Sequence, residues 1–208
     1  MSLNVLFIGN SFTARNNLPA LVELLAVAAG KQLKHRLINV GGASLRTHWN
    51  KGEAVGQIQR GRFDFVVLQE QSTLPIKNPG RMHENVRLFD ECIKAAGSKT
   101  ALYMTWARQH APESQAAITA AYMSIGREIG ARVIPAGVAW ERFLRRHDRP
   151  ILHDRDRSHP TLAGSYLAAC VVFGVLFHSS PAGLRVEVEG LAKDEAMLLQ
   201  KAAAEVLP

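Results

Sequence analysis

Short apolar runs, many of them β-branched, alternate along the chain with longer stretches in which apolar residues recur every three or four positions. The helical period is clearest in Met82–Ala96, where an apolar side chain returns at each turn. The predicted strands are Val5–Ile8, Arg36–Val40, Phe63–Leu68, Ala101–Thr105 and Arg132–Pro135. The predicted helices are Leu18–Ala29, the more polar Leu45–Gln59, Met82–Ala96, Ser114–Ile129, Thr161–Phe177 and Leu191–Leu207.

Glycines mark the ends of several predicted helices. Gly30, Gly97 and Gly130 each stand just before the next strand, where a left-handed C-capping residue is expected. Strands that alternate with helices are typical of βαβ units and of a parallel sheet covered on both faces. We therefore expect an α/β fold: a three-layer α/β/α sandwich with a flavodoxin-like, doubly wound, parallel five-stranded sheet. Ligands bind such sheets beyond the carboxyl ends of the strands, so functional residues should lie in strand-to-helix loops.

Composition and charge narrow the range of partners. The chain has 208 residues, of which 47% are hydrophobic, and this length fits one domain spanning residues 1–208. The net charge is +7, but the arginines are scattered except in Arg142–Arg157, and no aromatic stacking pattern accompanies them. We expect a solvated basic face and no nucleic-acid partner. The longest apolar stretch, Leu162–Phe177, is short for a membrane span and predicts a core helix, so no membrane partner is expected.

The cysteines and the first residues bear on location, and the histidines bear on cofactors. Cys92 and Cys170 each lie in an apolar helical pattern, which indicates free thiols in a reducing, cytoplasmic compartment. The start of the sequence lacks the features of a signal peptide, although the possibility that a signal peptide has been removed stays open. No HxH, HExxH or Cys/His cluster is present, and the arginines between His153 and His159 would oppose a cation. We expect no metal and no cofactor; the oligomeric state stays open.

Two short motifs carry candidate chemistry. After the first strand the chain reads Gly9-Asn10-Ser11, which belongs to neither a P-loop nor a GxGxxG or GxSxG motif. Alone, such a serine is most simply part of a turn with a helix-capping residue. Near the end of the chain, Asp156 precedes His159 by three residues, a spacing that lets the carboxylate hydrogen-bond one imidazole nitrogen and leaves the other as a base. Alone, this pair is most simply a capping aspartate and a surface histidine.

Together, the two motifs resemble those of the SGNH (GDSL-type) hydrolase superfamily. In that family a Gly-[Asp/Asn]-Ser motif after the first strand supplies the nucleophile, and a C-terminal Asp-x-x-His motif supplies the acid and base. The order, spacing and sheet positions match over nearly the whole chain, in a divergent branch with GNSFT, GG and LQEQS motifs. The resemblance implies a serine ester hydrolase in which His159 activates Ser11 and Asp156 orients the imidazole.

The resemblance also implies an oxyanion hole with three donors. The first is the backbone N–H of Ser11, and the second is a glycine N–H after the second strand, for which we favour Gly42 over Gly41. A glycine pair is also what a tight turn requires, and both roles can hold together. The third donor in the family is an asparagine after the third strand, where this chain has LQEQS instead. A glutamine amide can donate the same hydrogen bond, so we predict Gln69, with Gln71 as the alternative.

Candidate substrate contacts are Asn10, Trp106 and Arg108, which follow the first and fourth strands and so lie at one edge of the sheet. An aromatic ring beside an arginine suits a sugar face or an acidic acyl group, but core packing of Trp106 and a solvated Arg108 fit the sequence equally. Short loops leave little for a lid, which favours small acyl or acetyl esters, including those of carbohydrates, as small-molecule substrates. The alternative is a non-catalytic flavodoxin-like domain that binds a phosphate or nucleotide through Asn10, Ser11 and Thr13.

Overall fold

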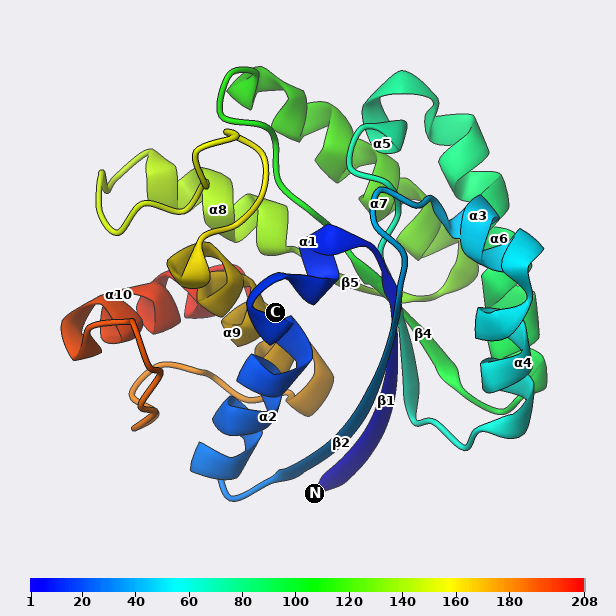
Figure 1. Cartoon of the computed structure of the whole chain (residues 1–208), viewed down its shortest axis with the longest axis horizontal. Coiled ribbons are helices and arrows are strands. Elements are labelled where there is room, and N and C mark those ends of the chain that lie inside the picture. Colours follow the sequence, from blue (N-terminus) through cyan, green and yellow to red (C-terminus); the bar gives the residue numbers. More distant parts are fainter. Residues whose placement is uncertain (208) are drawn as a thin grey trace.

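A parallel β-sheet runs through the middle of the protein (Figure 1). The computed structural model describes residues 1–207. Five strands pair in the order β2-β1-β3-β4-β5, and each neighbouring pair is parallel. This order confirms the expected doubly wound, flavodoxin-like α/β fold. The strands are β1 (Ser2–Gly9), β2 (Gln32–Asn39), β3 (Phe65–Leu68), β4 (Lys99–Tyr103) and β5 (Arg132–Ile134).

The strand order reverses at β1, in the centre of the sheet. From β1 the chain crosses to β2 on one side, and it then returns to β3 on the other side. Ile8 near the end of β1 pairs with Ile38 of β2 and with Leu68 of β3, so these strands end at the same level. Loops that leave adjacent strands toward opposite faces open a crevice at this edge, and the loops after β1, β2 and β3 meet there.

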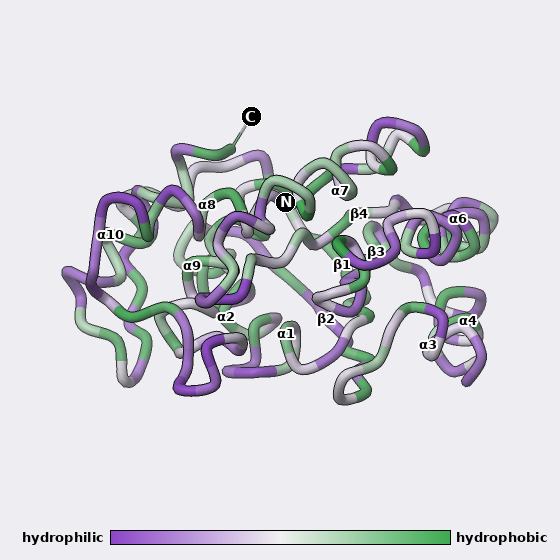
Figure 2. Tube along the Cα trace, turned by 90° about the horizontal axis from the view of Figure 1, so that it is seen from above, coloured by the Kyte–Doolittle hydropathy of each residue, from purple (hydrophilic) through white to green (hydrophobic). Residues whose placement is uncertain are grey.

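Helices cover both faces of the sheet (Figure 1). The side chains of β1 alternate between the two layers: Val5 and Phe7 pack against one, and Leu6 and Ile8 against the other. Figure 2 shows hydrophobic residues concentrated along the central strands and hydrophilic residues toward the periphery. The first layer consists of α2 (Leu18–Ala28), α8 (Ala136–Leu144), α9 (Leu162–Phe177) and α10 (Lys193–Ala204). The second consists of α3 (Leu45–Lys51), α4 (Glu53–Arg60), α6 (Pro79–Ala95) and α7 (Gln115–Ile129).

Helix α9 is the most deeply buried helix of the first layer. Every residue from Ala163 to Phe177 is buried, because the helix packs against α2, α8, α10 and β5. An apolar stretch that is surrounded on all sides needs no polar face, which explains its lack of helical amphipathicity. Within residues 1–207, no helix is both long and apolar enough to cross a membrane.

The structure differs from the predictions mainly in the helices. The stretch Leu45–Gln59 forms two helices, because Gly52 adopts a φ of 73° between α3 and α4. Helix α8 has no counterpart among the predicted helices, and neither do the short helices α1 (Ser11–Ala14) and α5 (Leu74–Lys77). The three predicted glycine caps are confirmed by their positive φ angles: 66° at Gly30, 75° at Gly97 and 67° at Gly130.

Candidate active site

The loop after β1 presents Ser11 at the carboxyl edge of the sheet. β1 ends at Gly9, and Ser11 is the first residue of α1, with Asn10 as its N-cap. The Asn10 Oδ1 accepts a hydrogen bond from the Phe12 backbone N at 3.0 Å, which begins the helix directly after the strand. Buried His48 of α3 donates from its Nε2 to the Gly9 carbonyl oxygen at 2.8 Å. Hydrogen bonds therefore hold the backbone before Ser11, at Gly9, and after it, at Phe12.

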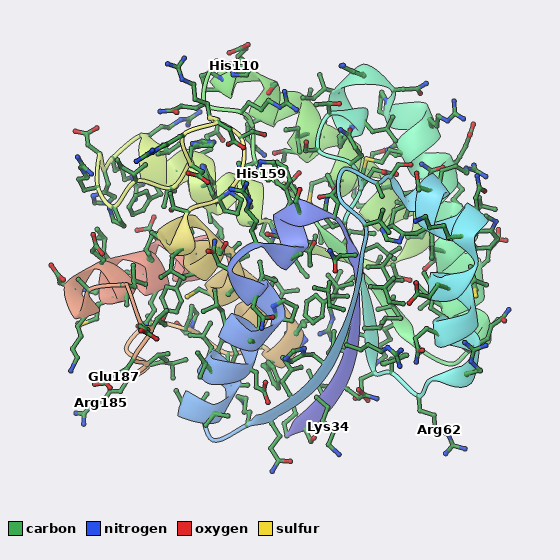
Figure 3. The ribbon with its side chains drawn as sticks, in the orientation of Figure 1. Lys34, Arg62, His110, His159, Arg185 and Glu187 are labelled. Atoms are coloured by element: carbon green, nitrogen blue, oxygen red, sulfur yellow. The ribbon has the colours of Figure 1, made fainter. Side chains whose placement is uncertain are left out.

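The loop between α8 and α9 brings a histidine onto the Ser11 hydroxyl. The Nε2 of His159 lies 2.8 Å from Ser11 Oγ, and its Nδ1 lies 2.5 Å from Asp156 Oδ2. Figure 3 shows His159 beside α1, at the opposite end of the sheet from Lys34 and Arg62. The side chains of Asp156, His159 and Ser11 are thus connected in this order by hydrogen bonds, from the carboxylate to the hydroxyl.

Local hydrogen bonds fix the carboxylate in this series. The Asp156 Oδ1 accepts from the backbone N–H groups of Ser158 at 3.0 Å and of His159 at 2.9 Å. The hydrogen bond from the His159 ring, helped by these backbone donors, holds the pKa of Asp156 far below its usual range. An ionised carboxylate at Nδ1 fixes the tautomer in which Nδ1 carries the proton, so Nε2 is free to accept one from Ser11.

The neighbouring Asp154 has a different partner. Its Oδ2 lies 2.5 Å from the Arg15 guanidinium, which follows α1 in the chain. The backbone N–H of Arg155 and this arginine together lower the pKa of Asp154. The ion pair joins the loop that carries His159 to the segment after Ser11. Asp154 is thus engaged by Arg15, whereas Asp156 is the carboxylate bonded to the His159 ring.

An aromatic stack supports the histidine loop from behind. The Phe12 ring centroid lies 5.1 Å from that of His159 and 5.2 Å from that of Trp106. Trp106 in turn stacks on Trp140 at a centroid distance of 3.8 Å, and its Nε1 donates to the Ser158 carbonyl oxygen at 3.0 Å. Trp106 is only 2% exposed, so the predicted substrate contact is corrected: the ring is enclosed by protein and holds the loop that carries His159.

The Gln69 side chain reaches the loop that carries the nucleophile. Its Oε1 accepts from the Asn10 backbone N at 2.8 Å and from Thr13 Oγ1 at 3.0 Å. Its amide nitrogen lies against the Glu70 carbonyl oxygen. The oxygen end of this amide therefore lies against the loop after β1, and its nitrogen, the donor end, faces the Glu70 carbonyl.

The Gln71 amide is engaged elsewhere. Its Oε1 accepts from Thr73 N and Thr73 Oγ1, both at 2.9 Å, and from Leu74 N at 3.1 Å. These bonds close the turn that leads into α5. Within residues 1–207 the Gln71 side chain makes no hydrogen bond to the loop after β1, so Gln69 is the one of these two glutamines whose side chain contacts that loop.

A glycine turn lies on the other side of the nucleophile loop. Ala43 N donates to Val40 O at 3.1 Å, and Gly42 has a φ of 67°, which a type II turn requires at its third residue. The Asn10 Nδ2 donates to Ala43 O at 3.0 Å and ties this turn to the loop after β1. Both ends of the Asn10 amide are therefore used within the protein and the residue is 2% exposed, so its predicted substrate contact is also corrected.

Sequence reasoning did not single out Glu70, which joins the start of α3 to the loop after β3. Its Oε1 accepts from Leu45 N at 3.0 Å and Gln71 N at 2.7 Å, and its Oε2 accepts from Asn85 Nδ2 at 2.9 Å. Burial raises the pKa of Glu70, and these donors oppose that rise. No short motif signals this role, because its partners come from α3, from its own loop and from α6.

Glu70→Gln is expected to lower the free energy of unfolding by about 1–3 kcal/mol, the cost of leaving buried polar groups unsatisfied. The new amide nitrogen is a donor and cannot accept a hydrogen bond. It therefore faces another donor, either the Asn85 side-chain amide or the backbone N–H of Leu45. Urea unfolding measures the loss, and Glu84→Gln, on the exposed face of α6, is the matched control. Equal stability of the two variants would contradict the proposed bridge.

Comparisons with known proteins support the class of fold. No family model and no curated protein matches this sequence. A candidate SGNH hydrolase from Slackia heliotrinireducens is 26% identical, with a TM-score of 0.69, covering 85% of this chain and 100% of its own. A DUF4886 family protein from Bacteroides uniformis is 20% identical, with a TM-score of 0.78, covering 99% of this chain and 94% of its own. An acetyl xylan esterase is 17% identical, with a TM-score of 0.63, covering 83% of this chain and 98% of its own.

The chain therefore has the fold of the SGNH-type hydrolases, as the sequence motifs predicted. Several of its structural neighbours are described as hydrolases or esterases, and these support a hydrolase activity.

Proposed function

We propose that this protein is a serine ester hydrolase in which Ser11 is the nucleophile, His159 the general base and Asp156 the carboxylate that orients it. The observation that carries the proposal is the hydrogen-bonded series of these side chains, with 2.8 Å between Ser11 and His159 and 2.5 Å between His159 and Asp156. Nucleophile and base within hydrogen-bond reach, with the base held by a third group, is the arrangement that activates a serine.

The proposed reaction proceeds through an acyl-enzyme. His159 Nε2 takes the proton from Ser11 Oγ as that oxygen attacks the ester carbonyl carbon, and the protonated imidazole is stabilised by Asp156. The oxyanion accepts hydrogen bonds from the backbone N–H groups of Ser11 and Gly42 and from the Gln69 amide. His159 then protonates the leaving alcohol. A water molecule, deprotonated by His159, attacks the acyl-enzyme and releases the acid and free Ser11.

The substrates proposed are esters with small acyl groups, acetyl first among them, and acetylated carbohydrates are the class to test first. The His159 side chain is 25% exposed and that of Asp156 44%, so the reacting groups lie close to the surface. The likeness to an acetyl xylan esterase agrees with this choice. Arg108 is exposed after β4 and stays a predicted contact for an acidic or sugar portion of the substrate.

The alternative of a phosphate- or nucleotide-binding domain gains no support. The Ser11 hydroxyl is engaged by His159, and both ends of the Asn10 side chain are used inside the protein. Two of the structural neighbours named above are described as a hydrolase and an esterase.

Labelling by a fluorophosphonate tests the proposed function. Ser11 Oγ should displace fluoride from phosphorus while His159 takes the proton, which leaves one phosphonyl group on the protein. Mass spectrometry of the digested protein should find the added mass on the peptide that contains Ser11. Protein that stays unlabelled, or that is labelled equally after unfolding, would speak for a binding domain.

Gln69→Ala is expected to lower kcat by roughly 10²–10³, the usual loss for one oxyanion donor. KM should change little, because the hydrogen bond forms mainly in the transition state. Gln71→Ala is the matched comparison, since its amide bonds the turn into α5 instead of the nucleophile loop. A large kcat loss in Gln71→Ala with a small one in Gln69→Ala would reverse the assignment.

A further inference from the structure

The peptide group between Gly9 and Asn10, directly before the candidate nucleophile, is held at both of its ends. Its N–H donates to Gln69 Oε1 at 2.8 Å, and its carbonyl oxygen accepts from His48 Nε2, also at 2.8 Å. The backbone N–H of Val40 reaches the same carbonyl oxygen at 3.3 Å, which is longer than is usual for such a bond. His48 is therefore the closer of the two donors to this carbonyl.

Helix α3 carries the His48 ring into the interior of the protein. Leu45 and His48 are buried three residues apart on one face of the helix, and α3 contacts β1. A carbonyl oxygen can only accept, so the Nε2 of His48 carries a proton. Burial lowers the pKa of His48, so the imidazole is neutral at pH 7 and has a single N–H. That N–H donates to Gly9.

The next peptide group carries the Ser11 N–H, the first proposed donor to the oxyanion. Its carbonyl oxygen, on Asn10, accepts from Thr13 N and Ala14 N, both at 3.0 Å. The N–H of a trans peptide points opposite to its carbonyl, so these bonds to α1 set the direction of the Ser11 N–H. The two peptide planes are joined only through the Cα of Asn10, so rotation of the first plane would turn the second as well. Holding the first plane therefore preserves the direction of the Ser11 donor.

His48 also joins the two segments that carry the proposed backbone donors, because α3 begins three residues after Gly42. We propose that His48 is a positioning residue for the oxyanion hole: its Nε2–H fixes the Gly9–Asn10 peptide against α3 and so keeps the Ser11 N–H in a fixed direction relative to that of Gly42. The inference rests on the proposed ester hydrolysis at Ser11. Oxyanion donors act through their preorganisation toward the transition state, so a misdirected donor lowers kcat and leaves KM nearly unchanged.

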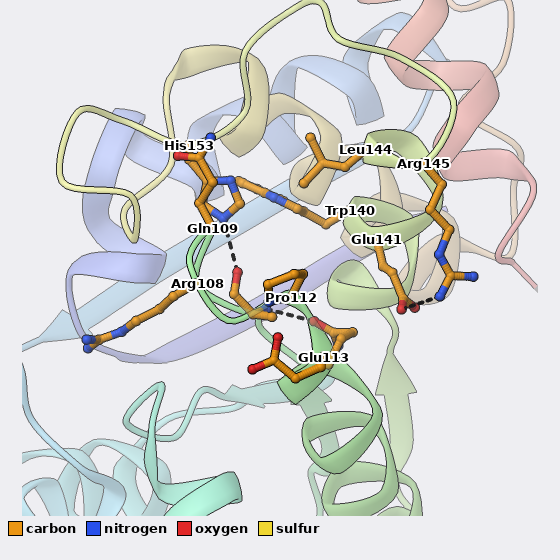
Figure 4. Close-up of a pocket in the computed structure, with 11 residues that line it drawn as sticks. Arg108, Gln109, Pro112, Glu113, Trp140, Glu141, Leu144, Arg145 and His153 are labelled. Atoms are coloured by element: carbon orange, nitrogen blue, oxygen red, sulfur yellow. Dashed lines mark hydrogen bonds and ion pairs between the residues drawn. The ribbon is translucent and has the colours of Figure 1, made fainter.

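Two other histidines make the same kind of bond away from the loop after β1. His153 Nε2 lies 3.0 Å from the Ala107 carbonyl oxygen, and both residues line the cavity between the segment after β4 and α8 (Figure 4). His83 Nε2 lies 2.9 Å from the Ala121 carbonyl oxygen and joins α6 to α7. The His83 bond has the same chemistry as that of His48 but holds no residue of the candidate site, so His83 is the matched control.

Three variants of His48 separate the hydrogen bond from the packing of the ring. His48→Gln keeps an N–H donor at the same number of bonds from Cα, His48→Asn carries the same amide on a shorter arm, and His48→Phe keeps a ring without the donor. With a chromogenic acetyl ester, His48→Phe and His48→Asn should lower kcat by about 10–100-fold and leave KM nearly unchanged, as expected for a small misplacement at a reacting site. His48→Gln should recover most of this loss, and His83→Phe should leave kcat nearly unchanged. The comparison of His48→Gln with His48→Asn stands even where His48→Phe fails to fold.

Hydrogen exchange at the Asn10 amide measures the positioning without any ester. In ¹⁵N-labelled protein, His48→Phe and His48→Asn should speed exchange of the Asn10 N–H at least about tenfold, as expected for a local opening, and His83→Phe should not. Unchanged kcat in His48→Phe and His48→Asn, a His48→Gln variant as slow as those two, or equal acceleration of exchange throughout the sheet would each overturn the proposal. An unaltered protein that turns over no ester would instead contradict the proposed function, and exchange at Asn10 would still decide whether His48 holds this peptide.

Discussion

Ser11→Ala is expected to lower kcat for a chromogenic acetyl ester by about 10⁶-fold, as in serine hydrolases that lose the nucleophile. The fold should survive, because within residues 1–207 the only hydrogen bond of the Ser11 hydroxyl runs to His159, and Asn10 supplies the cap of α1. Kinetics at saturating ester measure the first expectation, and urea unfolding measures the second. A residual rate above that of buffer is also expected, since the oxyanion donors remain.

Ser44→Ala is the matched control for this variant. Ser44 also begins a helix beside the site, where its Oγ accepts from Thr47 N at 3.3 Å. Loss of this cap should cost about 1 kcal/mol of stability and leave kcat nearly unchanged. Turnover that persists in Ser11→Ala and disappears in Ser44→Ala or Ser72→Ala would move the nucleophile to another serine.

The sheet could be predicted from the sequence because its signals are local. Buried parallel strands read as short apolar runs, and glycines end the helices before them. Helix α8 was missed although Ala136, Ala139, Trp140 and Phe143 recur at steps of three, one and three residues and are buried. Arg142 of this helix and the arginines of the following loop form a strongly charged stretch, which masked the apolar period.

The positions of Asn10 and Trp106 could not be predicted in the same way. Whether a side chain at a loop faces substrate or protein depends on partners that are distant in the sequence. Asn10 N meets Gln69, which lies 59 positions away, and Trp106 meets the carbonyl of Ser158, which lies 52 positions away. A motif fixes the order of the catalytic groups, but these contacts decide which residues hold the groups in place.

The carboxylate that serves His159 is the assignment with the second-largest expected effect. Asp156→Asn should lower kcat by about 10⁴, as the comparable change does in a serine protease triad. An amide keeps the size of the side chain but removes the negative charge that stabilises the imidazolium, and its nitrogen cannot accept the hydrogen bond from Nδ1. The low pKa of Asp156 means that this carboxylate stays ionised at every pH of an ordinary assay, so the unaltered protein should lose no activity through protonation of Asp156 in that range.

Asp154→Asn is the matched control, two residues away in the same loop. Asp154 pairs with Arg15 at 2.5 Å, and these side chains are 43% and 40% exposed, so the pair acts in solvent and contributes little to stability. We expect its kcat to fall by no more than about tenfold, through a small change in how the loop rests on the segment after α1. Both variants are to be measured across pH at fixed ionic strength. If Asp154→Asn proves the more damaging of the two, Arg15 and Asp154 hold the reacting geometry and the Asp156–His159 pair does not.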